Sequence, residues 1–482
     1  MDASNQDLTA LRDTRYLRAA LFFVLGANLV CSLYASIDAR GLYHDGVYYL
    51  FKIAEREGFF LHDPARNVVQ VLRQAPIVFL SKFTSLSLFA RAQAFSFVLL
   101  LLPPLLCLVC WVIAPRDRRG WILFPLAWLL IGFAATSMHA IGEGAIAAGY
   151  FWIMLFLLLF RTRKLASQLP FFLLCVFAIQ LHEGAFPLML VLLMACGYRA
   201  YGAEGRWEKG FLATSAAMIL LVFGYELNCV IHPQYPLDRA AILEGLKTFE
   251  FLLADGHLNL PLVSGTVALA ALMGVFLINL GAPATAEIYG RRVAVGFAVF
   301  SLAAIVLSLS VEQCFAPFAQ LQARYHPIFV SAALGTVAVV ILRLRLPDRL
   351  WMQPATISVL LALCLAQTVA DLVATGRWHA HVVDLRSRLA KAQGLIPWET
   401  MQHTGDARAD TDWHLMAVSW VIPVTSIVYA PSPSINALID LPAGSAYRPV
   451  DPEKPDLLPY LRGIDYSGYR RFFAVQKLGA SR

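Results

Sequence analysis

The sequence is poor in charged residues. Asp, Glu, Lys and Arg make up 15% of its 482 residues, against about 25% in an ordinary soluble domain. Hydrophobic residues make up 59%, and the mean hydropathy is +0.62. This composition excludes an ordinary soluble enzyme, a disordered chain and a coiled coil, all of which need more charged or polar positions. The chain is therefore expected to lie in a membrane.

Cysteine is scarce outside the apolar runs. Cys107 and Cys110 form a CxxC pair, but no second pair completes a metal site. The chain has no cysteine from 374 onward, so a disulfide framework in the C-terminal tail is excluded. A cleavable signal peptide is not expected either. The first apolar run, 16–34, is too long and lacks a clear cleavage site, which indicates a signal anchor.

Long apolar runs are what the sequence has in abundance. A helix needs about 20 apolar residues to cross a bilayer, and its backbone groups must be paired internally. The sequence therefore predicts an all-α polytopic membrane module at 1–373, followed by a small mixed α/β extracytoplasmic domain at 374–482. In the tail, 381–393 is predicted to form an amphipathic helix, and 426–432 and 472–478 are predicted to form short strands. A weaker run, 415–430, is interpreted as a buried strand or a membrane-docked segment. The eleven predicted spans are 16–37, 92–114, 121–138, 145–160, 169–181, 185–200, 211–230, 259–280, 293–311, 327–344 and 352–373.

Lysine and arginine concentrate in alternate loops between these spans. Positive loops stay on the cytoplasmic side, so the N-terminus is expected in the cytoplasm and the tail outside. The net charge of +7 follows from these loops and does not predict a nucleic-acid partner. All eleven histidines then fall on the outer side, where we expect the polar chemistry, because histidine carries protons and binds metals near neutral pH. The alternative is that histidine simply suits interfaces and longer loops.

The first outer loop, about 38–91, predicts two juxtamembrane helices. In 46–58, apolar side chains share one helical face and charged ones the other, which is typical of a helix lying on a membrane. Asp63 and Pro64 then form an N-cap followed by proline at the first helical position. An amphipathic segment follows them.

Four acidic residues gather at the outer ends of the predicted spans, where an ionisable group is costly: Asp45, Glu143, Glu183 and Glu312. A carboxylate there can act as a general base, relay protons, or hold Mg²⁺ or Mn²⁺ with a second ligand. The simpler alternative is that each acid caps a helix or pairs locally. His139 and Glu143 are four residues apart and would share a helical face, so they are the metal-ligand candidates. Three acids have a histidine neighbour: His44 with Asp45, His139 with Glu143, and His182 with Glu183.

Arginine is the residue type that would bind a phosphate, because its guanidinium fits phosphate oxygens through two nitrogens. Arg324 lies just before the tenth span, and Tyr325 and His326 beside it could add donors. Arg66 and Arg73 in the first outer loop are further candidates. The alternative for each is a plain membrane anchor.

The layout resembles the GT-C superfamily of polytopic membrane glycosyltransferases. The resemblance rests on a cytoplasmic N-terminus, a long first outer loop with two juxtamembrane helices, an extracytoplasmic tail, and the short motifs HDG, GEG and ARYH. It implies an enzyme that uses a polyprenyl-phosphate sugar, with Asp45 as the catalytic base, Glu143 positioning a metal or the acceptor, and Arg324 contacting the donor phosphate. His44 stands where many members have an acidic residue, and the second outer loop is very short, so a metal requirement stays open.

The function expected is an inverting glycosyltransferase of the bacterial inner membrane. It would move a sugar from a polyprenyl-phosphate donor to a hydroxyl of an envelope glycan, lipid or protein, among membrane lipids. One alternative is a secondary transporter or flippase in which the His–acid pairs relay protons. Against it, the acids cluster at one face and no inverted repeat is visible. Another alternative is a non-catalytic envelope-assembly protein.

Overall fold

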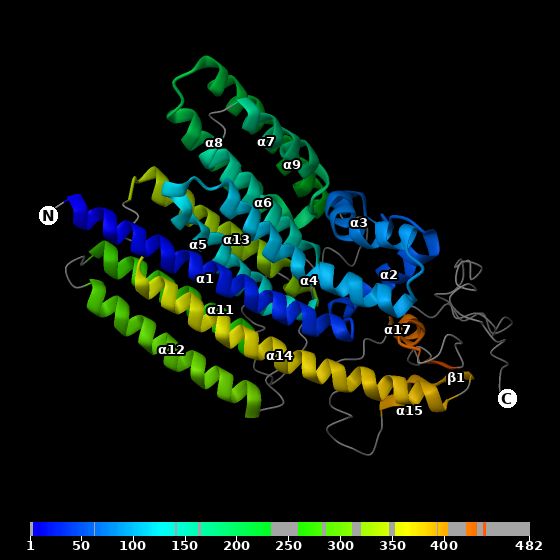
Figure 1. Ribbon diagram of the computed structural model, residues 1–482. Helices are drawn as coiled ribbons and strands as arrows, with labels where there is room; N and C mark the ends of the chain where they lie inside the picture. Colours follow the sequence, from blue (N-terminus) through cyan, green and yellow to red (C-terminus); the bar gives the residue numbers. More distant parts are fainter. Residues whose placement is uncertain are drawn as a thin grey trace.

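The computed structural model is a bundle of long helices with shorter elements gathered at one end (Figure 1). The helix α1 (Ala3–Ile37) ends there, beside α2 (Asp45–Arg56) and α3 (Asn67–Phe83). We call this the loop end of the bundle. The residues that the structure describes are 3–61, 63–139, 142–161, 165–232, 259–281, 286–310, 320–346, 352–392, 394–402, 421–430 and 437–439.

Within these ranges, ten helices are long and apolar enough to cross a membrane. The chain is therefore an integral membrane protein, as predicted. Ten of the eleven predicted spans have a counterpart in this set, and the eleventh, 169–181, corresponds to a shorter apolar helix, Gln168–Gln180. The ten are Arg15–Ile37, Leu88–Ile113, Arg116–Met138, Glu143–Phe160, Glu183–Tyr201, Arg206–Ile231, Leu260–Gly281, Glu287–Ser310, Tyr325–Arg343 and Pro354–Lys391.

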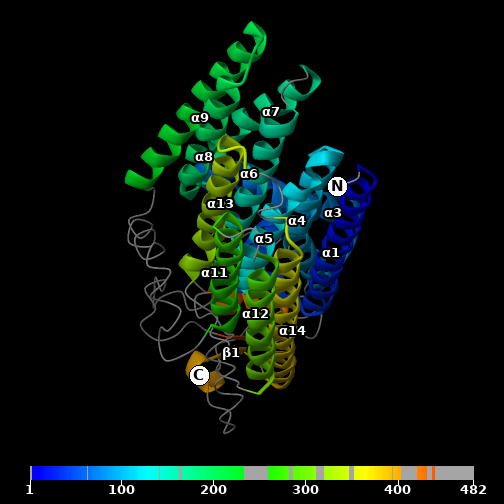
Figure 2. The ribbon, with the colours of Figure 1, turned by 90° about the vertical axis from the view of Figure 1, so that its left-hand side faces the viewer.

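The long helices form two groups. In both views α7, α8 and α9 stand together on one side of the bundle, away from α12 and α14 (Figure 2). The bounds are α4 (Leu88–Ile113), α6 (Glu143–Phe160), α7 (Leu165–Phe177), α8 (Phe186–Tyr201), α9 (Arg206–Ile231), α11 (Leu260–Gly281), α12 (Ala286–Ser310), α13 (Gln320–Arg343) and α14 (Pro354–Lys391).

The third span changes helix type along its length. It begins with the 3₁₀ turn η3 (Arg116–Ile122) and continues as α5 (Leu123–Trp128). A π turn, η4 (Leu129–Phe133), and a 3₁₀ segment, η5 (Ala134–His139), complete it. Such changes of winding are frequent at functional sites.

The two predicted helices of the first loop are present. Asp63 caps the 3₁₀ turn η2 (Pro64–Arg66), accepting a hydrogen bond from the Ala65 N–H at 2.9 Å, and α3 follows directly. The apolar face of α2 is buried, although it was predicted to lie on the membrane. Its cover is protein, because α17 (Ile422–Val428), α4 and α3 all pack against α2.

The described part of the tail corrects one prediction and extends another. Ser426, Ile427 and Val428, expected in a strand, lie in α17, which is a buried helix too short to cross a membrane. The amphipathic helix expected after 381 is the continuation of α14, since no proline interrupts the 38-residue helix. At about 1.5 Å per residue, α14 spans about 57 Å, well beyond a bilayer core of about 30 Å.

Two short strands accompany these helices. β1 (Gly394–Ile396) pairs in parallel with β2 (Ala437–Ile439), with Leu395 opposite Leu438. The helix α15 (Trp398–Gln402) follows β1. The α/β domain at 374–482 stays a prediction, because much of that range, including the strand expected at 472–478, lies outside the described residues. The orientation of the termini also stays a prediction.

Candidate functional site

Two arginines and two glutamates meet at the loop end of the bundle. The Arg73 Nη2 lies 2.9 Å from Glu143 Oε1. Arg66 contacts both acids: its Nη1 lies 3.5 Å from Glu143 Oε2, its Nε donates to Glu183 Oε2 at 2.7 Å, and its Nη2 donates to Glu183 Oε1. The Arg66–Glu183 pair therefore uses two guanidinium nitrogens, the strongest geometry for such a pair. We call Arg66, Arg73, Glu143 and Glu183 the arginine–glutamate cluster.

Local structure explains how each member reaches this place. Arg66 ends the capped turn η2, and Asp63 Oδ2 lies 3.2 Å from its Nε. Glu143 is the first residue of α6, where the helix dipole favours a carboxylate. Glu183 begins the 3₁₀ turn η7 (Glu183–Ala185), which is fixed by a 2.9 Å hydrogen bond from the Gly184 N–H to His182 Nδ1.

Glycine is required after Glu183 for reasons of space. A Cβ on Gly184 would lie 2.3 Å from Cε1 of Tyr325. The Tyr325 hydroxyl donates to Glu183 Oε1 at 3.4 Å. The sequence His-Glu-Gly thus lets α13 approach the turn closely enough to hold the glutamate.

The cluster is buried. Arg73 is 0% exposed, Glu143 2% and Glu183 5%. Because charges removed from water are strongly destabilising unless each is paired, these groups must balance one another. Separating any one of them from its partner is expected to be costly.

Tyr49 connects the cluster to Asp45. Its hydroxyl donates to Glu143 Oε1 at 3.3 Å, and the Arg73 guanidinium lies 4.0 Å from the centre of its ring. Asp45 stands one turn earlier on α2. Burial raises the pKa of Tyr49 to about 12, with the charges of Glu143 and Asp45 adding to the rise, so the phenol stays neutral near neutral pH.

Asp45 sits in a strained turn. His44, just before it, has φ 66° and ψ −120°, a conformation that a residue with a side chain adopts only under constraint. The His44 Nδ1 lies 2.7 Å from Asp45 Oδ1, and Asp45 is 8% exposed. The strain keeps carboxylate and imidazole together at the start of α2, facing the same neighbourhood as Tyr49.

Six of the predicted site residues thus come together at the loop end: His44, Asp45, Arg73, Glu143, His182 and Glu183. His326 instead lies with its Nε2 3.0 Å from the Ile131 carbonyl oxygen and faces η4. Arg324 lies in α13 and His139 ends η5, but their side chains, and the whole of Glu312, are outside the described residues.

Sequence reasoning missed Tyr49 and ranked Arg66 behind Arg324. Two signals in the sequence could have identified these residues. Tyr49 is four residues after Asp45, on the same face of the predicted helix. Arg66 is three residues after the capping Asp63, which fixes its position at the end of the first turn.

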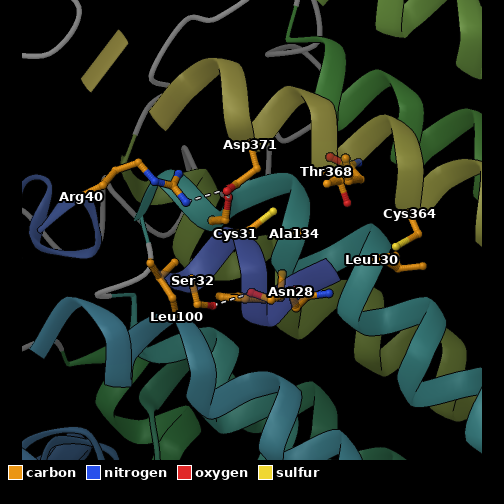
Figure 3. Close-up of a pocket in the computed structure, with 13 residues that line it drawn as sticks. Asn28, Cys31, Ser32, Arg40, Leu100, Leu130, Ala134, Cys364, Thr368 and Asp371 are labelled. Atoms are coloured by element: carbon orange, nitrogen blue, oxygen red, sulfur yellow. Dashed lines mark hydrogen bonds and ion pairs between the residues drawn. The ribbon is translucent and has the colours of Figure 1, made fainter. Parts of the chain in front are cut away.

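A second polar centre lies between α1, α14 and the third span (Figure 3). The Arg40 Nη2 donates to Asp371 Oδ1 at 2.7 Å, and the Ser137 hydroxyl donates to the same oxygen at 2.5 Å. Arg40 belongs to the 3₁₀ turn η1 (Arg40–Leu42). A small cavity of about 30 Å³ lies beside this pair and is also lined by Asn28, Ser32, Gln367 and Thr368.

A divalent metal does not fit the described residues well. No group of three or more His, Cys, Asp or Glu in the described ranges is placed to hold a metal ion. Glu143, the predicted ligand, has one oxygen beside Arg73 and the other beside Arg66. The prediction of Mg²⁺ or Mn²⁺ therefore depends on His139 and on other side chains outside the described ranges.

Comparison of the chain with protein-family models, with curated proteins and with solved structures found no match.

Proposed function

We propose that the protein is a membrane glycosyltransferase that moves a sugar from a polyprenyl-phosphate donor to an acceptor hydroxyl. One observation carries the proposal. A buried carboxylate, Asp45, is held in a strained turn at one end of a membrane bundle, one helical turn before Tyr49, which contacts Glu143 and Arg73 of the cluster. A lipid-linked donor presents its sugar–phosphate bond at that depth, where water meets hydrocarbon.

The reaction assigns a task to each group. Asp45 accepts the proton of the acceptor hydroxyl as its oxygen attacks the anomeric carbon. The bond from that carbon to the phosphate oxygen breaks, and the leaving polyprenyl phosphate gains negative charge. Arg66 and Arg73, which contact Glu143, are the cations that would stabilise that charge. A single displacement inverts the anomeric configuration.

The cluster sets a condition on donor binding. Both arginines are paired with glutamates, so a phosphate has to compete with a carboxylate for a guanidinium. Arg66 meets two glutamates and an aspartate, and it is therefore the arginine that can turn toward a phosphate and leave a partner behind.

A proton-coupled transporter or flippase is the second candidate. The observation that favours it is Glu226, a buried acid inside the span α9, because acids inside spans are frequent in proton pathways. Such a protein would move a solute with a pH gradient and would leave the sugar–phosphate bond intact.

The test is release of polyprenyl phosphate from labelled polyprenyl-phosphate sugars by the purified protein in nanodiscs. A membrane-lipid and polysaccharide extract serves as the acceptor, and parallel samples contain EDTA. Turnover by the wild type that Asp45→Asn abolishes would support the proposal. Turnover that Asp45→Asn leaves unchanged would contradict the assignment of the base. Loss of turnover with EDTA would show a metal requirement.

A matched control is Asp384→Asn, which removes a half-exposed carboxylate paired with Arg388 on α14. This pair lies outside the cluster, so we expect turnover to stay near that of the wild type. Flux driven by a pH gradient, without cleavage, would favour the transporter.

A further inference from the structure

The inward face of α9 ends in an acid. The residues of α9 that are buried lie three or four positions apart, as on one face of a helix, and all but the last are apolar or small. The last, Glu226, is 1% exposed. These buried positions are Leu212, Ser215, Ile219, Val222 and Glu226.

Glu226 has no hydrogen-bond partner among the described residues. Both carboxyl oxygens are buried, and neither accepts a hydrogen bond from a described group. The arginine that contacts Glu183 has other partners, since Arg66 is paired with three acids. An ionised carboxylate in such a place is far more costly than a neutral acid.

The surroundings of Glu226 are already rich in negative charge. The helix α9 packs against η7, which carries Glu183, and the charge of Glu183 acts on Glu226. On α9 itself the titratable neighbours are Tyr225 and Cys229, and the charge of Asp63 acts on both. Beyond Glu183 come His182 and Arg66, and then Tyr325 of α13.

Charge balance therefore favours a neutral Glu226. The two arginines of the cluster face Glu143, Glu183 and Asp63, so negative charge exceeds positive before Glu226 is counted. A further negative charge would add repulsion and gain no described cation.

We propose that Glu226 is a proton-binding site, a neutral carboxylic acid at rest that supplies a proton or a hydrogen bond to Glu183. When Arg66 leaves Glu183, the O–H of Glu226 donates to the Glu183 carboxylate. If the proton transfers fully, the O–H bond of Glu226 breaks, one forms on Glu183, and the negative charge moves to Glu226. That Glu226 carries a proton at rest does not depend on the identity of the substrate. That this proton is used when a phosphate binds Arg66 rests on the proposed function.

The first experiment is infrared spectroscopy of the wild-type protein in nanodiscs at neutral pH. We expect a carbonyl band of a protonated carboxylic acid that shifts in D₂O, disappears in Glu226→Gln and moves in Glu226→Asp. Glu208→Gln, which removes an acid paired with Arg199, should leave the band unchanged. A band that survives in Glu226→Gln overturns the proposal. If Glu226→Gln fails to fold, the Glu226→Asp spectrum decides, because an unshifted band also overturns it.

The second experiment measures the use of the proton, with a short-chain polyprenyl phosphate as the probe. Glutamine at 226 keeps a neutral donor, so Glu226→Gln should bind the probe as the wild type does. Glu226→Leu removes the donor and should bind about tenfold more weakly, the effect of one hydrogen bond. Equal binding by Glu226→Leu would overturn the coupling to Glu183. A confirmed infrared band in a wild type that binds no probe would instead contradict the proposed substrate.

Discussion

Two buried arginine–carboxylate centres occur in the same bundle, and they differ in design. In the Arg40–Asp371 centre one arginine meets one acid, helped by Ser137, and the pair joins the turn after α1 to the middle of α14. In the arginine–glutamate cluster each arginine shares Glu143, and Arg66 also meets Glu183. An arginine paired with one acid has a single stable arrangement. An arginine that contacts several acids can exchange one of them for another anion.

The neighbours of the two centres differ in the same way. The cluster lies near Tyr49, the strained Asp45 turn and the buried acid Glu226. The Arg40–Asp371 pair lies near the hydroxyl and amide groups of Ser32, Thr368 and Asn28. We therefore propose the cluster as the centre of the chemistry and the Arg40–Asp371 pair as a contact that holds helices together.

The largest effect is expected at Asp45. Asp45→Asn keeps the side-chain size and removes the base, so turnover should fall about a hundredfold or more, while thermal stability stays near the wild-type value. The measurement is release of polyprenyl phosphate, with an unfolding curve for each sample. A comparable fall in Asp371→Asn, after correction for folded protein, would remove the distinction between the two centres.

The next effect is on stability and concerns Asp371. Asp371→Asn leaves the buried Arg40 without a charged partner and should lower the free energy of unfolding by about 3–5 kcal/mol. Replacing both partners, with Arg40→Met and Asp371→Leu, should recover much of that loss. The control is Glu287→Gln, which breaks an exposed pair with Arg291 and should cost less than about 1 kcal/mol. Thermal unfolding in nanodiscs measures all three.

Replacement of arginine by lysine is expected to affect donor binding in one centre and not in the other. Arg66→Lys keeps the charge but loses the two-nitrogen contact, so binding of a polyprenyl phosphate should weaken about tenfold, the effect of about 1.4 kcal/mol. Arg40→Lys should leave that binding within a factor of about two. Equal losses in the two variants would show that Arg66 has no special part in donor binding.

The smallest effect is expected at Tyr49. Tyr49→Phe removes one hydrogen bond to Glu143, which should cost about 0.5–1.5 kcal/mol of stability. The pKa of Tyr49 is raised by burial to about 12, so the folded protein keeps this phenol neutral while the unfolded chain ionises it from about pH 10. Stability from this group is thus present below pH 10 and is lost as the pH rises from about 10 to 12. Unfolding curves across that range should fall less steeply in Tyr49→Phe.

The spans and the loop helices could be predicted from the sequence because each follows from a local rule. Apolar run length gave boundaries such as 145–160 for a helix observed at Glu143–Phe160, and the Asp63–Pro64 cap located η2. The placement of the spans also predicted that several acids lie at the same end of the bundle. These features need no knowledge of which helices are neighbours.

Pairing inside the site could not be predicted, because it depends on contacts between distant segments. Arg66 and Glu183 are 117 residues apart, and nothing local shows that they meet. Glu226 was not singled out from the sequence, because its importance depends on the packing of α9 against η7. The strand expected at 426–428 was wrong. The sequence of this short apolar segment is compatible with either a strand or a helix, and its packing against α2 favours the helix.

The packing of α17 on α2 affects the order in which the protein can be completed. The Tyr429 hydroxyl donates to the Asp38 carbonyl oxygen at 3.0 Å, across 391 residues of chain. At a synthesis rate of about 5–20 residues per second, α17 emerges roughly 20–80 seconds after the segment it covers. During that interval only α3 and α4 cover the apolar face of α2. The part of this face that α17 later covers can rest on the membrane surface, so the bilayer can serve as a temporary partner for the nascent loop until α17 takes its place.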